Sequence, residues 1–142
     1  MRKNQSIEEI QNIIKYKFKN NKNLINSLTH PGFYKTYNKS KKNIANEFER
    51  LEFLGDRVLG LVVSSLIYDK FKDFNEGDLS KKFSFLVQGN FLYKLALSLN
   101  LDKYLNYSKQ KINFRINKSI LSDSLESLIG AIYIDGGLKA AT

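Results

Sequence analysis

Apolar residues recur at intervals of three or four along most of this chain, which is the spacing of one face of an α-helix. The pattern predicts a first amphipathic helix from Ile7 and a short second helix that ends at His30, Pro31 and Gly32. The full set of expected helices covers residues 7–18, 24–28, 46–71, 79–87, 91–99 and 117–134. Proline occurs once and glycine is sparse, so the predicted fold class is all-α, a bundle built around a long central helix.

Residues suited to capping predict where these helices begin and end. The expected N-terminal caps are Ser6 (in a capping box with Glu9), Asn46 (with Glu49 three positions later), Asp78 and Asn90. The run Asp135-Gly136-Gly137 is expected to end the last of the helices.

The central helix carries a row of acids. An α-helix turns by about 100° per residue, so Glu49, Glu52 and Asp56 project from one narrow face. The remaining positions are apolar around most of the circumference, which is typical of a helix in the middle of a bundle. Arg50 and Arg57 point elsewhere, so the acid row has no basic partner on its own helix.

Two interpretations of this acid row are open on the pattern alone. Closely spaced carboxylates without a counter-charge repel one another and raise one another's pKa unless a cation lies among them. The row is therefore either a divalent-metal site or a solvated acidic patch. Burying acids is costly unless their charge is compensated, and this argument favours the metal.

A second acid pair lies on the last expected helix. Asp123 and Glu126 are neighbours on one face, and Gly130 continues that face without a side chain. If the two acid faces meet across the bundle, their oxygens suit a hard cation such as Mg²⁺ or Mn²⁺, which can activate water against a phosphodiester. The chain offers no Ser-His-Asp set, and its single histidine, His30, is expected to be a turn or packing residue.

The excess of basic residues over acidic residues bears on the kind of partner that the protein binds. The net charge is +9, which indicates either an anionic partner such as nucleic acid or only a generally basic surface. Residues 35–43 are rich in Lys, Asn, Ser and Tyr, and predict a flexible basic loop that either contacts phosphates or only links helices. A basic chain that nevertheless clusters its acids fits a nuclease, which needs cations for the backbone and carboxylates for the metal.

The expected compartment is the cytoplasm. The chain has no cysteine, and its polar, charged N-terminus predicts no signal peptide. The longest apolar run, residues 58–68, is too short to span a bilayer.

Four stretches of the chain resemble the ribonuclease III family. The run ERLEFLGD at residues 49–56 resembles the family signature, and a match of this length is highly specific. Leu28-Thr29-His30 is similar to the LTH element that lies early in family members. The run EGDLS at residues 76–80 is similar to a turn of the family, and SDSLESLIGA at residues 122–131 is similar to its helix with the pattern D-x-x-E. The resemblance covers about Ile7 to Leu138.

The resemblance implies a ribonuclease III-type helical bundle that cleaves double-stranded RNA and leaves 5′-phosphate and 3′-hydroxyl ends. It implies roles in rRNA and mRNA processing, and a homodimer with one site per subunit, each cutting one strand. By the same resemblance Glu52, Asp123 and Glu126 would ligate Mg²⁺, with Mn²⁺ as a substitute. Asp56 and Glu126 would be the catalytic acids, and Asp56 would complete the site directly or through a metal-bound water.

Three further residues take roles from the resemblance. Glu49 and Glu76 would be outer acids near the RNA or a second metal position. Phe53 matches the aromatic that family members insert into a socket on the partner subunit, whereas the apolar pattern alone would place it in the core.

The resemblance also implies a single domain over residues 1–142, the nuclease domain alone. The chain stops just inside an expected further helix, so we expect a C-terminal truncation and no double-stranded-RNA-binding domain. The runner-up function is a catalytically silent RNA-binding or dimerisation module of the same fold, and a third reading is a metal-binding bundle that is not a nuclease. All six acids of the family pattern are present, which favours the active enzyme.

Overall fold

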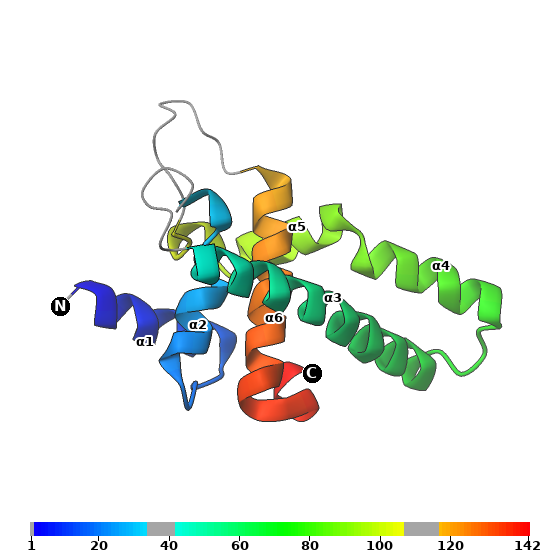
Figure 1. The fold of residues 1–142 in the computed structure, drawn as a ribbon. Helices are drawn as coiled ribbons and strands as arrows, with labels where there is room; N and C mark the ends of the chain where they lie inside the picture. Colours follow the sequence, from blue (N-terminus) through cyan, green and yellow to red (C-terminus); the bar gives the residue numbers. More distant parts are fainter. Residues whose placement is uncertain (1, 34–41, 107–116) are drawn as a thin grey trace.

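The structure is a computed structural model that describes residues 2–33, 42–106 and 117–142, and these residues form an all-α fold, as predicted (Figure 1). The helices are α1 (Arg2–Ile14), α2 (Asn21–Ser27), η1 (Pro31–Phe33), α3 (Lys42–Lys70), α4 (Glu76–Val87), α5 (Gly89–Ser98), η3 (Leu101–Lys103) and α6 (Lys118–Ala141). Most of the predicted basic loop at residues 35–43 lies outside the described residues. None of the described helices is long and apolar enough to cross a membrane.

Two long helices, α3 and α6, cross each other and organise the fold (Figure 1). Helices α2 and α5 pack against α6, and α1 lies beyond α2. Beyond the crossing, α3 continues outward and α4 returns alongside it, so the two form an arm that projects from the bundle (Figure 1).

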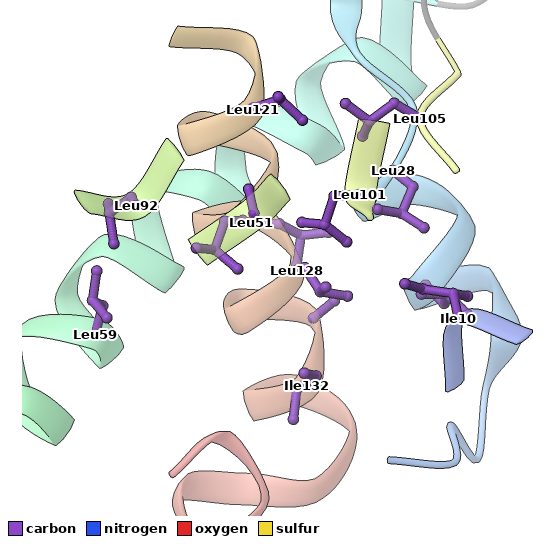
Figure 2. Close-up of a cluster of buried hydrophobic side chains, with 14 of the residues drawn as sticks. Ile10, Leu28, Leu51, Leu59, Leu92, Leu101, Leu105, Leu121, Leu128 and Ile132 are labelled. Atoms are coloured by element: carbon purple, nitrogen blue, oxygen red, sulfur yellow. The ribbon is translucent and has the colours of Figure 1, made fainter. Parts of the chain in front are cut away.

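The hydrophobic core surrounds α6 (Figure 2). The predicted apolar stripe of this helix is largely confirmed, because Leu121, Leu125, Leu128 and Ile132 are buried. Leu51 and Leu59 of α3 and Leu92 of α5 pack into the same cluster, with Ile10, Leu28 and Leu101 on its other side. The core therefore holds α6 rigidly between elements that are distant in sequence.

The outer half of α3 does not match the prediction of a helix buried all round. Leu61 and Leu66 are 54% and 52% exposed, although the apolar pattern placed both in a bundle interior. The physical reason is that α3 extends beyond α6, so that among the described helices only α4 packs against this part of α3. Helix α4 itself has no buried residue. The arm thus presents apolar side chains that the rest of the described chain leaves uncovered.

Four predicted helix caps are wrong. Helix α1 begins at Arg2 and α3 at Lys42, so Ser6 and Asn46 lie inside helices. Neither proline nor glycine lies in the residues directly before Ser6 or Asn46, so nothing there interrupts the helix. A residue suited to capping marks only a position at which a helix can begin. Helix α4 is capped by Asn75, whose side chain accepts from the Asp78 amide at 2.9 Å, and α5 is preceded by Gln88 rather than capped by Asn90.

The C-terminal end of α6 is tied to the loop between α1 and α2. Gly137 has φ 79° and breaks the helix near the predicted end, after which one more turn runs to Ala141. Just before the break, the Asp135 carboxylate accepts from the Tyr16 hydroxyl at 2.7 Å, the Lys19 amide at 2.8 Å and the Asn20 amide at 3.0 Å. Burial alone would raise the pKa of Asp135, but these hydrogen bonds outweigh it and the net shift is downward.

We expect Asp135→Asn to destabilise the chain by about 1–2 kcal/mol, because an amide oxygen cannot accept all of these hydrogen bonds and carries no charge. Since the folded-state pKa lies below the ordinary 3.8, the contribution is present above that pH and is lost as the pH falls through the lowered value. Thermal unfolding from pH 7 to pH 3 checks this: the gap between wild type and variant should be constant near neutral pH and narrow as the pH falls below about 4. The exposed Asp73→Asn is the matched control, and a gap that is independent of pH would contradict the assignment.

Candidate metal centre

The crossing of α3 and α6 brings the two backbones into direct contact at a pair of glycines. A methyl group at Gly55 would lie 1.7 Å from the Glu126 carbonyl oxygen, and one at Gly130 would lie 2.2 Å from the Leu51 carbonyl oxygen. Only glycine fits at either position. Beside the contact, the Ser127 hydroxyl donates to the Phe48 carbonyl at 3.3 Å. This close approach places the acids that flank the crossing next to one another.

Glu52 of α3 and Asp123 and Glu126 of α6 form a cluster, here called the acid trio. Each offers a carboxylate oxygen, and these atoms all lie within 4.8 Å of one another. Carboxylate oxygens are the ligands that Mg²⁺ prefers, and ions bound at about 2.1 Å hold their ligands up to about 4 Å apart. The donor set therefore fits a hard divalent cation after small side-chain movements, and the predicted meeting of the two acid faces is confirmed for these three residues.

Burial and mutual repulsion make the acid trio hard to ionise. Burial, then the charges of Asp123, Glu49 and Asp56, raise the pKa of Glu52 to about 7. Burial, then Asp56, Asp123 and Glu52, raise the pKa of Glu126 to about 7 against an opposing attraction from Arg57. At neutral pH the cluster thus holds either protons or a cation.

These shifts predict an unusual pH dependence for the metal-free chain. Because the folded-state pKa of Glu52 and Glu126 exceeds the ordinary 4.5, the folded state binds more protons than the unfolded state between about pH 4.5 and 7. Stability should therefore fall as the pH rises through that window. Melting temperatures in EDTA at pH 5 and pH 7.5 check this. Mn²⁺ should restore stability at the higher pH, and a metal-free chain that gains stability from pH 5 to pH 7.5 would contradict the prediction.

Asp56 and Glu49 lie at the edges of the acid trio. Asp56 is exposed and accepts from Arg57 at 2.8 Å, and its charge raises the pKa of both Glu52 and Glu126. Glu49, one turn before Glu52, is also exposed, and its charge helps to raise the pKa of Glu52. The row predicted on α3 is thus a half-buried acid flanked by two acids in water.

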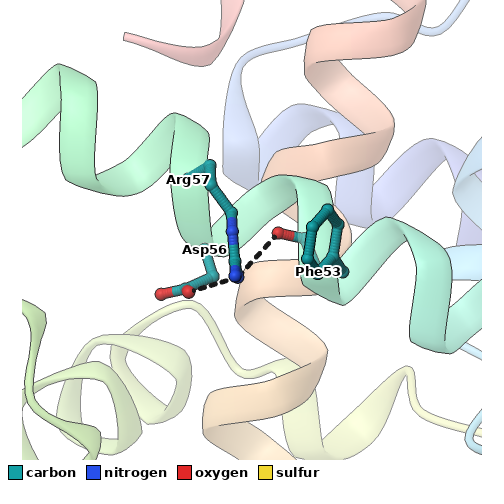
Figure 3. Close-up of polar contacts among 3 residues, drawn as sticks. All are labelled: Phe53, Asp56 and Arg57. Atoms are coloured by element: carbon teal, nitrogen blue, oxygen red, sulfur yellow. Dashed lines mark hydrogen bonds and ion pairs between the residues drawn. The ribbon is translucent and has the colours of Figure 1, made fainter.

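Two other predicted site residues lie apart from the trio. Glu76 is in the first turn of α4, at the tip of the arm, where it accepts from the Ser80 hydroxyl at 3.2 Å. Phe53 is not a core residue, because its side chain is 62% exposed beside Arg57 (Figure 3). Both residues face solvent in the single chain.

Sequence reasoning missed two side chains that act on Asp123. The Ser119 hydroxyl donates to Asp123 at 3.2 Å, a contact that the four-residue spacing on α6 could have revealed. Burial raises the pKa of Asp123, and the Ser119 hydrogen bond and the charge that His30 carries when its ring is protonated oppose that rise. The expected turn and packing role of His30 is also present, since its Nδ1 accepts from the Gly32 amide at 3.1 Å and its ring meets Phe48.

Comparisons with known proteins identify the family of this chain. A family profile described as ribonuclease-III-like matches residues 20–142. The chain is 44% identical to Ribonuclease 3 of Ehrlichia canis and 42% identical to Ribonuclease 3 of Campylobacter jejuni, in each case over 95% of its own length. A solved nuclease domain of Ribonuclease III from C. jejuni superposes with a TM-score of 0.81 at 42% identity, covering 95% of this chain and 90% of that one.

The chain therefore belongs to the ribonuclease III family. It spans 58% of the length of the E. canis protein and 57% of the C. jejuni protein. The solved C. jejuni structure is described as flexible in a region involved in dimer formation.

Proposed function

We propose that this chain is a divalent-metal-dependent endoribonuclease that hydrolyses double-stranded RNA and leaves 5′-phosphate and 3′-hydroxyl ends. The observation that carries the proposal is the acid trio, assembled by two helices in a chain whose relatives are named Ribonuclease 3. Mg²⁺ is the proposed ion and Mn²⁺ the substitute. Processing of rRNA and mRNA in the cytoplasm is the proposed setting.

Each acid has a proposed role that follows from its place. Glu52, Asp123 and Glu126 hold the ion, which when bound supplies Lewis-acid activation of water and neutralises charge on the phosphoryl group. Asp56, exposed beside the trio, would complete the site, directly or through a water molecule that the ion holds. Glu49, farther out on α3, faces the RNA or a second metal position.

A homodimer is the second part of the proposal, and the arm supports it. Helix α4 has no buried residue, and Leu61, Leu66 and Phe85 are each more than half exposed. Apolar side chains concentrated on a projecting pair of helices are typical of a surface that another protein covers. A second copy is the proposed partner, and each subunit would cut one strand. In the dimer the tip of the arm, with Glu76, would reach toward the RNA or the partner's acids.

Phe53 has a proposed docking place in the same dimer. Beside its ring lies a hollow of about 660 Å³, here called the Phe53 hollow, lined by Asn46, Leu51, Leu54 and Ile134 among others. Ile134 is more than half exposed there. The hollow of one chain is the proposed receptor for the ring of the other.

Double-stranded RNA is the proposed substrate on grounds of charge and family. The net charge of +9 favours phosphate binding, and duplex RNA is recognised through its shape, phosphates and 2′-hydroxyls. Cleavage of a long perfect RNA duplex at low salt, in Mg²⁺, in Ca²⁺ and in EDTA, tests the proposal, with a single strand of the same length as control. Cutting of the duplex in Mg²⁺ only is the expected result. An intact dimer that binds the duplex but never cuts it would favour the silent module.

A further inference from the structure

Arg57 connects the exposed ring of Phe53 to the edge of the acid trio (Figure 3). Its Nη1 donates to Asp56 Oδ2 at 2.8 Å and to the Phe53 carbonyl oxygen at 3.4 Å. The Cζ atom of the same guanidinium lies 3.9 Å from the centroid of the Phe53 ring. One side chain thus stacks on an aromatic ring and binds an acid at the same time.

The charge of Arg57 opposes the binding of a divalent ion. A guanidinium fixed on Asp56 neutralises part of the negative charge that attracts a cation to the acid trio, and it repels the cation directly. Both side chains are more than half exposed, so water screens the effect and keeps it modest. Arg57 therefore weakens the metal site without blocking it.

The stacking partner of Arg57 lies where a second chain would cover it. Phe53 is 62% exposed and lines the Phe53 hollow. A ring that enters the hollow of another chain would meet Leu54 and Ile134 beside polar and charged side chains. Docking of this kind would compete with the guanidinium for the ring, and an Arg57 displaced from the ring would lose the stacking that supports its place on Asp56.

We propose that Arg57 is a positioning residue that couples subunit docking to metal binding: it holds Asp56 while the Phe53 ring is open to solvent and releases Asp56 when a second copy covers the ring. The inference rests on the homodimer of the proposed function. It follows that a docked chain binds a divalent ion more tightly than a free chain. Because binding free energies are reciprocal and each dimer holds two ions, saturating metal tightens the dimer by the square of that factor.

The experiment measures the dimer dissociation constant of the 142-residue chain by sedimentation equilibrium, in saturating Mn²⁺ and in EDTA. Electron paramagnetic resonance gives the Mn²⁺ dissociation constant of the same samples. In wild type, Mn²⁺ should tighten the dimer by about two- to fivefold for each subunit, the scale of a single exposed ion pair, and hence by about 4- to 25-fold in the dimer dissociation constant. In Arg57→Gln the ratio of the two dimer constants should fall to about one, with Mn²⁺ bound tightly even by the free chain.

Two further variants separate charge from stacking. Arg57→Lys keeps the positive charge but not the planar group, so the free chain should bind Mn²⁺ as weakly as wild type while the coupling falls. Lys94→Gln removes one exposed charge from α5 and should keep wild-type coupling. This control corrects for the change in net charge.

Three outcomes would overturn the inference: wild-type coupling in Arg57→Gln, a wild-type dimer that Mn²⁺ does not tighten, and a wild-type chain that stays monomeric at every concentration. The last would also remove the proposed dimer. Failure of the nuclease proposal is a different result, namely a wild-type chain that shows the Mn²⁺ coupling and yet leaves duplex RNA uncut.

Discussion

Glu126→Gln should abolish cleavage of duplex RNA, with a rate at least about 10³-fold below wild type, while RNA binding is retained. Glu126 is the trio member whose backbone carbonyl lies at the helix crossing. Its half-buried carboxylate offers an oxygen within 4.8 Å of those of both other acids. Glutamine keeps its size but offers a neutral oxygen, which is a poor ligand for a hard divalent ion. Cleavage rates and fluorescence anisotropy on the same duplex separate the two effects.

The same variant should be more stable than wild type when no metal is present. Repulsion from Asp56, Asp123 and Glu52 contributes to the raised pKa of Glu126, and a neutral side chain removes that repulsion. A higher melting temperature in EDTA, together with lost activity, excludes unfolding as the cause. Glu8→Gln, an exposed change on α1, is the control and should leave both quantities unchanged. A Glu126→Gln chain that cuts at near wild-type rate would remove the proposed role of the trio.

Of the glycine-to-alanine substitutions in the described chain, Gly55→Ala should destabilise the fold most. Its Cβ would lie 1.7 Å from a backbone carbonyl of α6, and neither helix backbone can yield without separating the two helices. Alanine ordinarily favours a helix over glycine by about 1 kcal/mol, so the sign of the effect is itself diagnostic. We expect destabilisation of about 2–4 kcal/mol from overpacking, measured by urea unfolding.

Gly60→Ala is the matched control, because it lies on the same helix five residues later. The nearest atom to its Cβ is the tip of the Phe83 ring at 3.6 Å, which is ordinary contact, so the variant should be neutral or slightly stabilising. Gly55→Ala should also weaken Mn²⁺ binding under conditions where it remains folded, since Glu52 moves away from Asp123 and Glu126. Equal stability of the two variants would show that the helices do not meet at Gly55.

The meeting of acids from two helices was predictable from the sequence, because helical spacing alone placed acids on one face of each helix. Gly130 was seen to continue the acid face of α6 without a side chain, but the close approach of two backbones at this residue is known only from the structure. Spacing could not show which acids would be half-buried and which exposed. That depends on where α6 crosses α3, and the crossing leaves Glu52 beside the α6 acids and Asp56 in water.

The limits of the fold prediction have a related cause. An apolar pattern reports that a side chain is suited to burial, and Leu61 and Leu66 carry that pattern although the single chain leaves them exposed. The sequence also could not predict that His30 lies close to Asp123, because the two residues are far apart in sequence and tertiary packing brings them together. Capping residues failed at α1 and α3 because they are local signals that a growing helix can override.

The glycine crossing tolerates substitution less than the acid trio does. An acid of the trio can be replaced by a neutral amide of the same size without a steric clash, and the exchange removes charge repulsion. Gly55 and Gly130 allow no such exchange, because any side chain there collides with a backbone. If the proposed RNA cleavage were lost in a descendant of this chain, we would therefore expect the acids to change before the two glycines.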